Sequence, residues 1–234
     1  MRFHTQTAGC TLTAQQPEIN IVRVTLQALA AVLGGTQSLH TNSMDEALAL
    51  PSEKAVRIAL RTQQIIAEES GVTDTVDPLG GSYYIEWLTD KMEEETYKYF
   101  DKVERLGGVI PAIEKGFFQR EIAESAYRYQ KETDEKKRIF VGVNRYKLDE
   151  EISIPILKMD EKGEERQSHR LKKLRKERDN GKVQKNLSRL RKAAEGEENL
   201  MPFILECIHS YATLGETCDV LREVFGEYKE PAVF

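Results

Sequence analysis

The sequence predicts an α/β fold, in which two βα units of the barrel type precede a mainly α-helical region. Residues 2–9 and 34–43 are predicted to be parallel strands, because polar side chains recur at every second position. The segment between them has the apolar spacing of a helix, and after residue 71 helical spacing dominates. Parallel strands joined by a crossover helix are the repeat of α/β barrels.

The first crossover helix is predicted to open at Pro17–Glu18, since proline is favoured in the first turn. Its apolar residues follow the helical period: Ile19, Val22, Leu26, Leu29, Ala30 and Leu33. Gly34–Gly35 ends this helix and leads into the second strand. A second helix is expected from about Pro51 to Glu69, with Gly71 as its stop.

Beyond Gly71 the pattern predicts a helical hairpin. A long helix follows Gly80–Gly81 and ends near Leu106, and a second one reaches from Gly107–Gly108 to about Lys131. Residues 138–144 are the one later strand candidate.

The last part of the chain reads as a linker followed by helices. Residues 149–155 are the linker, and two helices are expected over about 162–194 and 199–225. The chain therefore divides into barrel units at 1–71, a hairpin with a short strand at 72–148, and a linker with C-terminal helices at 149–234.

The two predicted strands carry polar side chains where a barrel interior is ordinarily apolar. His4 and Gln6 share a face of the first strand, and Ser38, His40 and Asn42 share one of the second. An unsatisfied buried polar group costs roughly 1–3 kcal/mol. These side chains therefore predict a polar ligand threaded along the barrel.

Composition favours an intracellular protein with a substantial core. The chain has 234 residues, of which 40% are hydrophobic. It shows no membrane-length apolar run and no signal-peptide pattern, so the cytoplasm is the expected compartment. Cys10, Cys207 and Cys218 lack CxxC spacing, which argues against a disulfide or zinc framework.

A net charge of −5 argues against indiscriminate nucleic-acid binding. Residues 166–192 are locally basic, and their leucines at Leu171, Leu174, Leu187 and Leu190 have helical spacing. A solvated helix pair is the simplest interpretation of this segment. Contact with an acidic partner subunit and contact with RNA are the alternatives.

Several motifs resemble the coenzyme B12-dependent methylmalonyl-CoA mutases. The first is Arg-Phe-His-Thr-Gln-Thr-Ala-Gly-Cys-Thr-Leu-Thr at 2–13, and the longest is Gly-Gly-Thr-Gln-Ser-Leu-His-Thr-Asn-Ser-Met-Asp-Glu-Ala-Leu-Ala-Leu-Pro at 34–51. The others are Asn-Ile-Val-Arg at 20–23, Asp-Pro-Leu-Gly-Gly-Ser-Tyr at 77–83, Phe-Val-Gly-Val-Asn-Arg-Tyr at 140–146, Leu-Gly-Glu at 214–216 and Val-Phe-Gly-Glu-Tyr at 224–228.

The resemblance implies the C-terminal part of the large, catalytic subunit: the last two βα units of a (β/α)8 TIM-type barrel and the helical region after them. The family's catalytic residues then lie upstream, so no catalytic residue is expected in this chain. The family's cobalamin signature, Asp-x-His-x-x-Gly, is absent, because none of the 4 histidines has Asp two residues before it. The resemblance therefore implies two protein partners, the N-terminal mutase part and a cobalamin-binding subunit.

The resemblance assigns His4, Gln6, Gln37 and Ser38 to binding of the acyl-CoA substrate. The alternative for these residues is that they are structural polar groups with internal partners.

The cofactor-facing residues implied by the resemblance are Gly9, Cys10, Glu46 and Ala49, and the cofactor is adenosylcobalamin. Ordinary turn geometry is an alternative for Gly9, and a capping box formed by Ser43 and Glu46 is one for Glu46. Cys10 stands where relatives often carry a large aromatic residue. No metal ligand is assigned.

The implied reaction is the radical interconversion of (R)-methylmalonyl-CoA and succinyl-CoA. Two strands cannot close a barrel, so the isolated chain is expected to be inactive. A mutase acting on isobutyryl-, hydroxyisobutyryl- or ethylmalonyl-CoA is the nearest alternative. The other is a non-catalytic assembly module of a mutase complex. Neither nucleic acid nor a membrane is an expected partner.

Overall fold

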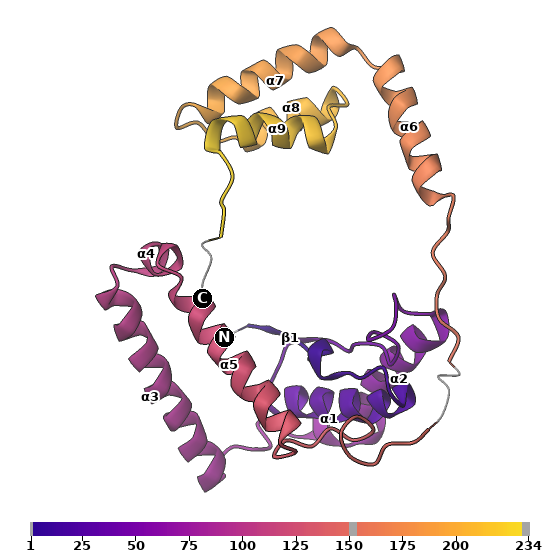
Figure 1. The fold of residues 1–234 in the computed structure, drawn as a ribbon, viewed down its shortest axis with the longest axis vertical. Helices are drawn as coiled ribbons and strands as arrows, with labels where there is room; N and C mark the ends of the chain where they lie inside the picture. Colours follow the sequence, from indigo (N-terminus) through magenta and orange to yellow (C-terminus); the bar gives the residue numbers. More distant parts are fainter. Residues whose placement is uncertain (1, 150–153, 231–234) are drawn as a thin grey trace. The chain divides into compact units, whose positions relative to one another are not determined.

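The computed structural model describes residues 2–149 and 154–230. The fold is α/β, mostly helical, with a small parallel sheet (Figure 1). The described residues form two compact units that divide between Lys158 and Met159. In the described parts of the chain, no helix combines the length and apolar character needed to cross a membrane.

The first unit begins with the predicted order of strand, helix, strand and helix. Strands β1 (His4–Gln6) and β2 (Ser38–His40) pair in parallel, with His4 opposite Ser38 and Gln6 opposite His40. Two short 3-10 turns, η1 (Gly9–Thr11) and η2 (Pro17–Ile19), precede α1 (Asn20–Leu33), and α2 (Glu53–Glu69) follows β2. In the described residues the sheet has these two strands alone, and the expected (β/α)8 barrel stays a prediction.

Helices α1 and α2 pack through small and branched side chains. Val24 and Ala28 of α1 and Ala55, Ala59 and Ile66 of α2 are buried. Alanines at the contact let the two helix axes approach closely, and their burial removes apolar surface from water. This packing fixes the helical layer on which the sheet rests.

Helix α2 is capped by Ser52, whose hydroxyl accepts a hydrogen bond from Ala55 N at 3.3 Å. Gly71 follows the end of α2 with φ +70°, a left-handed conformation that suits the helix stop predicted there. The capping-box alternative for Ser43 and Glu46 is wrong, because these residues open a turn and the next helix begins only at Glu53.

The helical hairpin differs from its prediction in one helix. After η3 (Val72–Asp74), α3 (Tyr83–Arg105) is a single helix, as expected, but the second helix is broken into α4 (Val109–Glu114) and α5 (Phe117–Asp134). Gly116, with φ +66°, allows the left-handed turn between α4 and α5. The Tyr99 hydroxyl donates a hydrogen bond to Glu121 and so joins α3 to α5.

The strand expected at 138–144 is wrong; this segment is a loop. Gly142 N donates to Arg145 O at 2.8 Å, and Phe140 N donates to the Asn144 side chain at 2.7 Å. The same Asn144 amide donates to Arg138 O at 2.7 Å. Turn contacts and a side chain thus satisfy the backbone groups that a strand would pair with a neighbour. The predicted linker at 149–155 lies mostly outside the described residues.

The second unit is helical. It consists of α6 (Gly163–Glu177), α7 (Asn180–Ala194), α8 (Met201–His209) and α9 (Leu214–Phe225). The two long helices predicted here are therefore each broken in two. Asp179 caps α7 by accepting from Lys182 N at 3.0 Å, and Thr213 and Glu216 form a capping box at α9.

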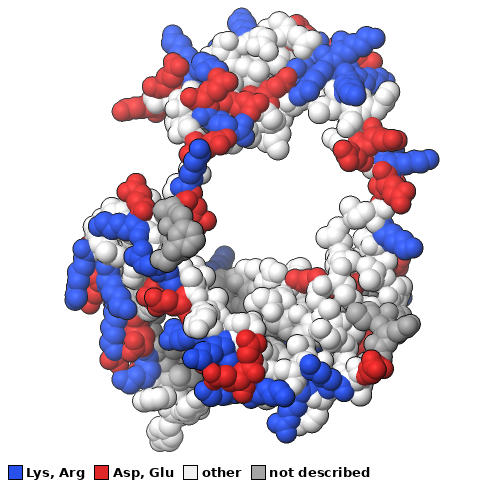
Figure 2. All heavy atoms as spheres, in the orientation of Figure 1, with Lys and Arg blue, Asp and Glu red and all other residues white. Residues whose placement is uncertain are grey.

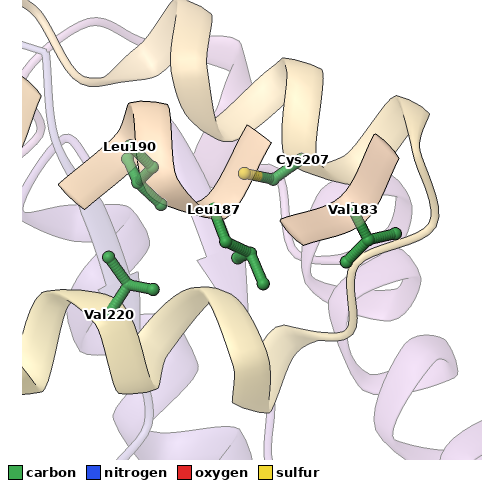
Figure 3. Packing of buried hydrophobic residues seen from close by; sticks show 5 residues of the cluster. All are labelled: Val183, Leu187, Leu190, Cys207 and Val220. Atoms are coloured by element: carbon green, nitrogen blue, oxygen red, sulfur yellow. The ribbon is translucent and has the colours of Figure 1, made fainter. Parts of the chain in front are cut away.

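Helices α7, α8 and α9 enclose the core of the second unit (Figure 3). Val183, Leu187 and Leu190 of α7 lie against Cys207 of α8 and Val220 of α9. The leucines that predicted a helical stripe are therefore core residues in α7, whereas Leu171 and Leu174 of α6 are half-buried. Lys and Arg side chains gather where α6 meets α7 (Figure 2).

Candidate functional site

A row of polar side chains lies along one face of the β1–β2 pair. His4 Nδ1 lies 2.7 Å from Ser38 Oγ on the neighbouring strand. In both strands the outer positions are exposed and the middle ones, Thr5 and Leu39, are half-buried. Because side chains alternate along a strand, His4, Gln6, Ser38 and His40 share the face opposite Thr5 and Leu39.

The other side of the sheet is tied to α2. Gln63 Nε2 donates to Leu39 O at 3.0 Å, and Thr41 Oγ1 donates to Ala59 O at 2.8 Å. The polar row therefore lies on the sheet face away from the helical layer, which in an α/β barrel is the interior. In this open two-stranded sheet, His4, Gln6 and Ser38 are exposed.

Gln37 is not brought into this row. Its Oε1 accepts from Phe3 N at 2.8 Å, and its Nε2 donates to Gly35 O at 2.9 Å. Both ends of the amide thus bind backbone groups near the start of the strands, which is a structural use of this side chain.

A second polar cluster lies past the carboxyl ends of the strands. Thr7 Oγ1 donates to Asn42 Oδ1 at 2.9 Å and accepts from Asn42 N at 2.9 Å. Gln6 Nε2 reaches the same Asn42 oxygen at 3.5 Å. The amide of Asn42 therefore joins the end of the polar row to the loops that follow the strands.

Gly9 lies in close contact with this cluster. A Cβ atom built on Gly9 would be 2.2 Å from Glu46 Oε1 and 2.8 Å from Asn42 Nδ2. Real Cβ atoms do not approach other atoms so closely, so a side chain at position 9 would force the Glu46 carboxylate and the Asn42 amide to shift. The Glu46 carboxylate thus lies directly over the Gly9 backbone.

Two buried polar atoms in the segment 42–46 have no hydrogen-bond partner in the described residues. They are Asn42 Nδ2 and Asp45 Oδ1. Leaving such atoms unpaired costs roughly 1–3 kcal/mol each, so native structures contain few of them. The polar alternation that continues past His40 placed Asn42 on the polar face, but it assigned the residue no role.

Three of the predicted site residues line one open groove between β2 and α2. Gln6, Glu46 and Ala49 contribute to it, and its volume is about 630 Å³. Exposed apolar side chains of Leu50, Val56 and Leu60 form its other wall. Cys10 lies outside the groove, in η1, and its thiol is free and exposed.

Comparison with known proteins identifies relatives of the whole chain. The sequence model described as "Methylmalonyl-CoA mutase" matches residues 1–227. The 2-hydroxyisobutanoyl-CoA mutase large subunit of Aquincola tertiaricarbonis is 48% identical over 100% of this chain and 42% of its own length. The methylmalonyl-CoA mutase of Escherichia coli is 45% identical over 99% of this chain and 33% of its length.

The mitochondrial methylmalonyl-CoA mutase of Homo sapiens is 42% identical over 98% of this chain and 31% of its length. The chain thus spans between about a third and two fifths of these curated relatives. These matches confirm the resemblance that the sequence motifs indicated.

Proposed function

The chain belongs to the methylmalonyl-CoA mutase family, and we propose that it forms the C-terminal part of the substrate barrel of a coenzyme B12-dependent acyl-CoA mutase. The reaction proposed for the complete enzyme is the interconversion of (R)-methylmalonyl-CoA and succinyl-CoA. The observation that carries this proposal is the polar row on β1 and β2, which ends at a buried, unsatisfied amide beside Gly9.

In this proposal β1 and β2 are the last two strands of the barrel. A two-stranded sheet leaves unpaired backbone groups at both edges, and the remaining strands would pair with them. The chain alone cannot enclose a substrate, so it is inactive in isolation.

The acyl-CoA arm is proposed to run along the polar row. His4, Gln6 and Ser38 present hydrogen-bonding groups on the face that becomes the barrel interior. A pantetheine chain carries amides that can donate to and accept from such groups. Gln37 would join them only by exchanging its contacts with Phe3 and Gly35.

Adenosylcobalamin is proposed to face Gly9, Cys10, Glu46 and Ala49, and the residues present fit a bulky polar cofactor. The unpaired Asn42 Nδ2 donor and the Glu46 carboxylate both lie against Gly9, which has no side chain to separate them from its backbone. When bound, this cofactor supplies the radical chemistry of the rearrangement. The chain's own residues would orient substrate and cofactor and exclude water.

One observation favours a second substrate. The relative from Aquincola tertiaricarbonis, named for 2-hydroxyisobutanoyl-CoA, is 48% identical, slightly above the methylmalonyl-CoA mutases at 42% to 45%. Cys10, at a position where the family resemblance implies a large aromatic residue next to the corrin, would also leave a looser packing face. Isobutyryl- and ethylmalonyl-CoA remain further candidates, and the choice depends on residues upstream of this chain.

The proposed partners are the N-terminal part of the mutase, a cobalamin-binding subunit and the acyl-CoA substrate, in the cytoplasm. We also propose the division into 1–71, 72–148 and 149–234 as functional parts. A non-catalytic assembly module is the alternative from another class; such a module has no use for the Gly9 contacts and the free Asn42 amide.

Reconstitution tests the proposal. The purified chain is mixed with the N-terminal part, the cobalamin subunit and adenosylcobalamin, and product is followed by chromatography with methylmalonyl-CoA and 2-hydroxyisobutanoyl-CoA as substrates. The expected result is turnover of one substrate by the full mixture and none when this chain is omitted. A folded complex that binds the cofactor but turns over neither of these acyl-CoA esters, nor isobutyryl- or ethylmalonyl-CoA, would defeat it.

A further inference from the structure

We propose that Arg23 is a positioning residue that couples the loop after α5 to the loop that carries Gly9 and Cys10. Residues 8–16 are termed the β1–α1 loop, and Phe140–Tyr146 the return loop. This inference rests on the proposed function, because it explains how the cofactor-facing loop is held in place.

The β1–α1 loop has little regular structure, and polar side chains of α1 hold it. Gln27 accepts from Ala8 N at 2.7 Å and donates to Thr11 Oγ1 at 2.8 Å. The fully buried Asn20 accepts from Thr13 N at 3.1 Å and donates to Thr13 O and Met44 O, both at 2.9 Å. The loop therefore takes its position from α1.

Arg23 extends this network to the return loop. Its Nη1 donates to Thr13 Oγ1 at 3.0 Å and to Asn20 Oδ1 at 2.8 Å, while its Nη2 donates to Val141 O at 2.7 Å. Only a planar fork with several donors can serve these acceptors at once. Partial burial desolvates this guanidinium and lowers its pKa.

A second contact joins the same two loops. Gln16 Nε2 donates to Tyr146 O at 3.2 Å, and Gln16 itself has φ +48°. A Cβ on Gly142, where φ is +83°, would lie 3.1 to 3.3 Å from the Gln16 amide. Two contacts between segments more than 110 residues apart thus hold the β1–α1 loop against the return loop.

Amide hydrogen exchange on the full chain tests the coupling directly. Arg23→Lys keeps the charge but loses the fork. Arg57→Lys is the matched control, because Arg57 is exposed and its ion pair in the described part of the chain is with Glu53. Arg23→Lys loses hydrogen bonds that the guanidinium donates to Thr13, Asn20 and Val141. The exchange rate should therefore rise about tenfold in residues 8–16 and also in residues 140–146. Exchange in α2 should stay unchanged, and Arg57→Lys should match the wild type.

Gly142→Ala tests the coupling from the other side. The added methyl strains the return loop and presses on Gln16, so exchange in residues 8–16 should rise at least about threefold despite the distance in sequence. The coupling is refuted if Arg23→Lys raises exchange in only one of the two loops, or if Gly142→Ala raises it only in the return loop. It is also refuted if either variant raises exchange equally in α2.

A kinetic measurement in the reconstituted enzyme separates positioning from general stability. Arg23→Lys should raise the half-saturating adenosylcobalamin concentration about tenfold and leave the KM for acyl-CoA within about twofold. Equal increases in the half-saturating adenosylcobalamin concentration and in the KM for acyl-CoA would contradict the inference. If the wild-type complex shows no turnover, the proposed function fails, and the exchange result alone decides the coupling.

Discussion

His4 and Ser38 meet across the parallel β1–β2 pair, where the imidazole Nδ1 lies 2.7 Å from the hydroxyl Oγ. Both residues are exposed in the described chain, so the contact adds little to folding. This contact orients the ring, and among the described residues Nε2 makes no hydrogen bond. The proposed use of this nitrogen is contact with the acyl-CoA arm.

Ser38→Ala should therefore affect binding more than stability. We expect the free energy of unfolding to change by less than about 0.5 kcal/mol, because the hydroxyl is exposed. The KM for acyl-CoA in the reconstituted enzyme should rise about threefold to tenfold, because the imidazole loses its orienting partner. Ser82→Ala is the control, since that hydroxyl makes no capping hydrogen bond. An unchanged KM would exclude a role for this pair.

Gly9→Ala should weaken cofactor binding. The new methyl would meet Glu46 Oε1 at 2.2 Å and Asn42 Nδ2 at 2.8 Å, so Glu46 must turn away and Asn42 must shift. We expect about 1–2 kcal/mol of destabilisation and at least a tenfold loss of cobalamin affinity, measured by titration of the reconstituted complex. Gly163→Ala, with no neighbour near its Cβ, should change neither. Wild-type cobalamin affinity in Gly9→Ala would contradict this arrangement.

The ion pair between Arg178 and Glu216 predicts a pH dependence of stability. Arg178 Nη1 and Nη2 donate to the two carboxylate oxygens at 2.7 and 2.5 Å. This contact lowers the pKa of Glu216 to about 2 from its usual 4.5. A depressed folded-state pKa stabilises the protein above the unfolded value, and that stability is lost as the pH falls through the folded value.

Glu216→Gln should accordingly flatten the acid limb of the stability curve. We expect the variant to lose about 2–3 kcal/mol at neutral pH and to approach the wild type between pH 4.5 and 2, in urea denaturation of the full chain. Glu223→Gln removes a more exposed pair and should cost under about 1 kcal/mol. A wild-type pH profile in Glu216→Gln would refute the assignment.

Leu190→Ala should destabilise the second unit strongly. Leu190 is fully buried in the α7–α9 core (Figure 3). Truncating a buried leucine leaves a cavity and costs about 2–5 kcal/mol, measured by thermal or urea denaturation. Leu205→Ala, at a position that is 49% exposed, is the control and should cost less than about 1 kcal/mol. Equal losses of unfolding free energy in Leu190→Ala and Leu205→Ala would show that Leu190 does not lie in the core.

The long periodic elements could be predicted from the sequence, because apolar spacing and glycine stops act locally. The helices at 20–33, 53–69 and 83–105 were all predicted within a few residues. The breaks at Gly116, Asp179 and Thr213 were not predicted, because the apolar pattern continues through them. The features that make these breaks are local: a left-handed turn at Gly116 and side-chain caps at Asp179 and Thr213.

The site was predictable in part. Alternation placed His4, Gln6 and Ser38 on one face, but it could not show that the Gln37 amide binds Phe3 and Gly35. The segment at 138–144 read as a strand because its branched residues have strand propensity, whereas Asn144 and Gly142 supply turn contacts. The reach of Arg23 to Val141 spans 118 residues, and no local pattern encodes it.

The acyl-CoA KM of a His4→Ala/Gln6→Ala double variant tests the central claim most directly. The variant is assembled with the N-terminal part, the cobalamin subunit and adenosylcobalamin, beside wild type and Ser82→Ala. If the polar row binds the acyl-CoA arm, the KM should rise at least about thirtyfold, since two hydrogen-bonding groups are lost while the complex still assembles. A double variant that assembles and keeps the wild-type KM and turnover would contradict the claim.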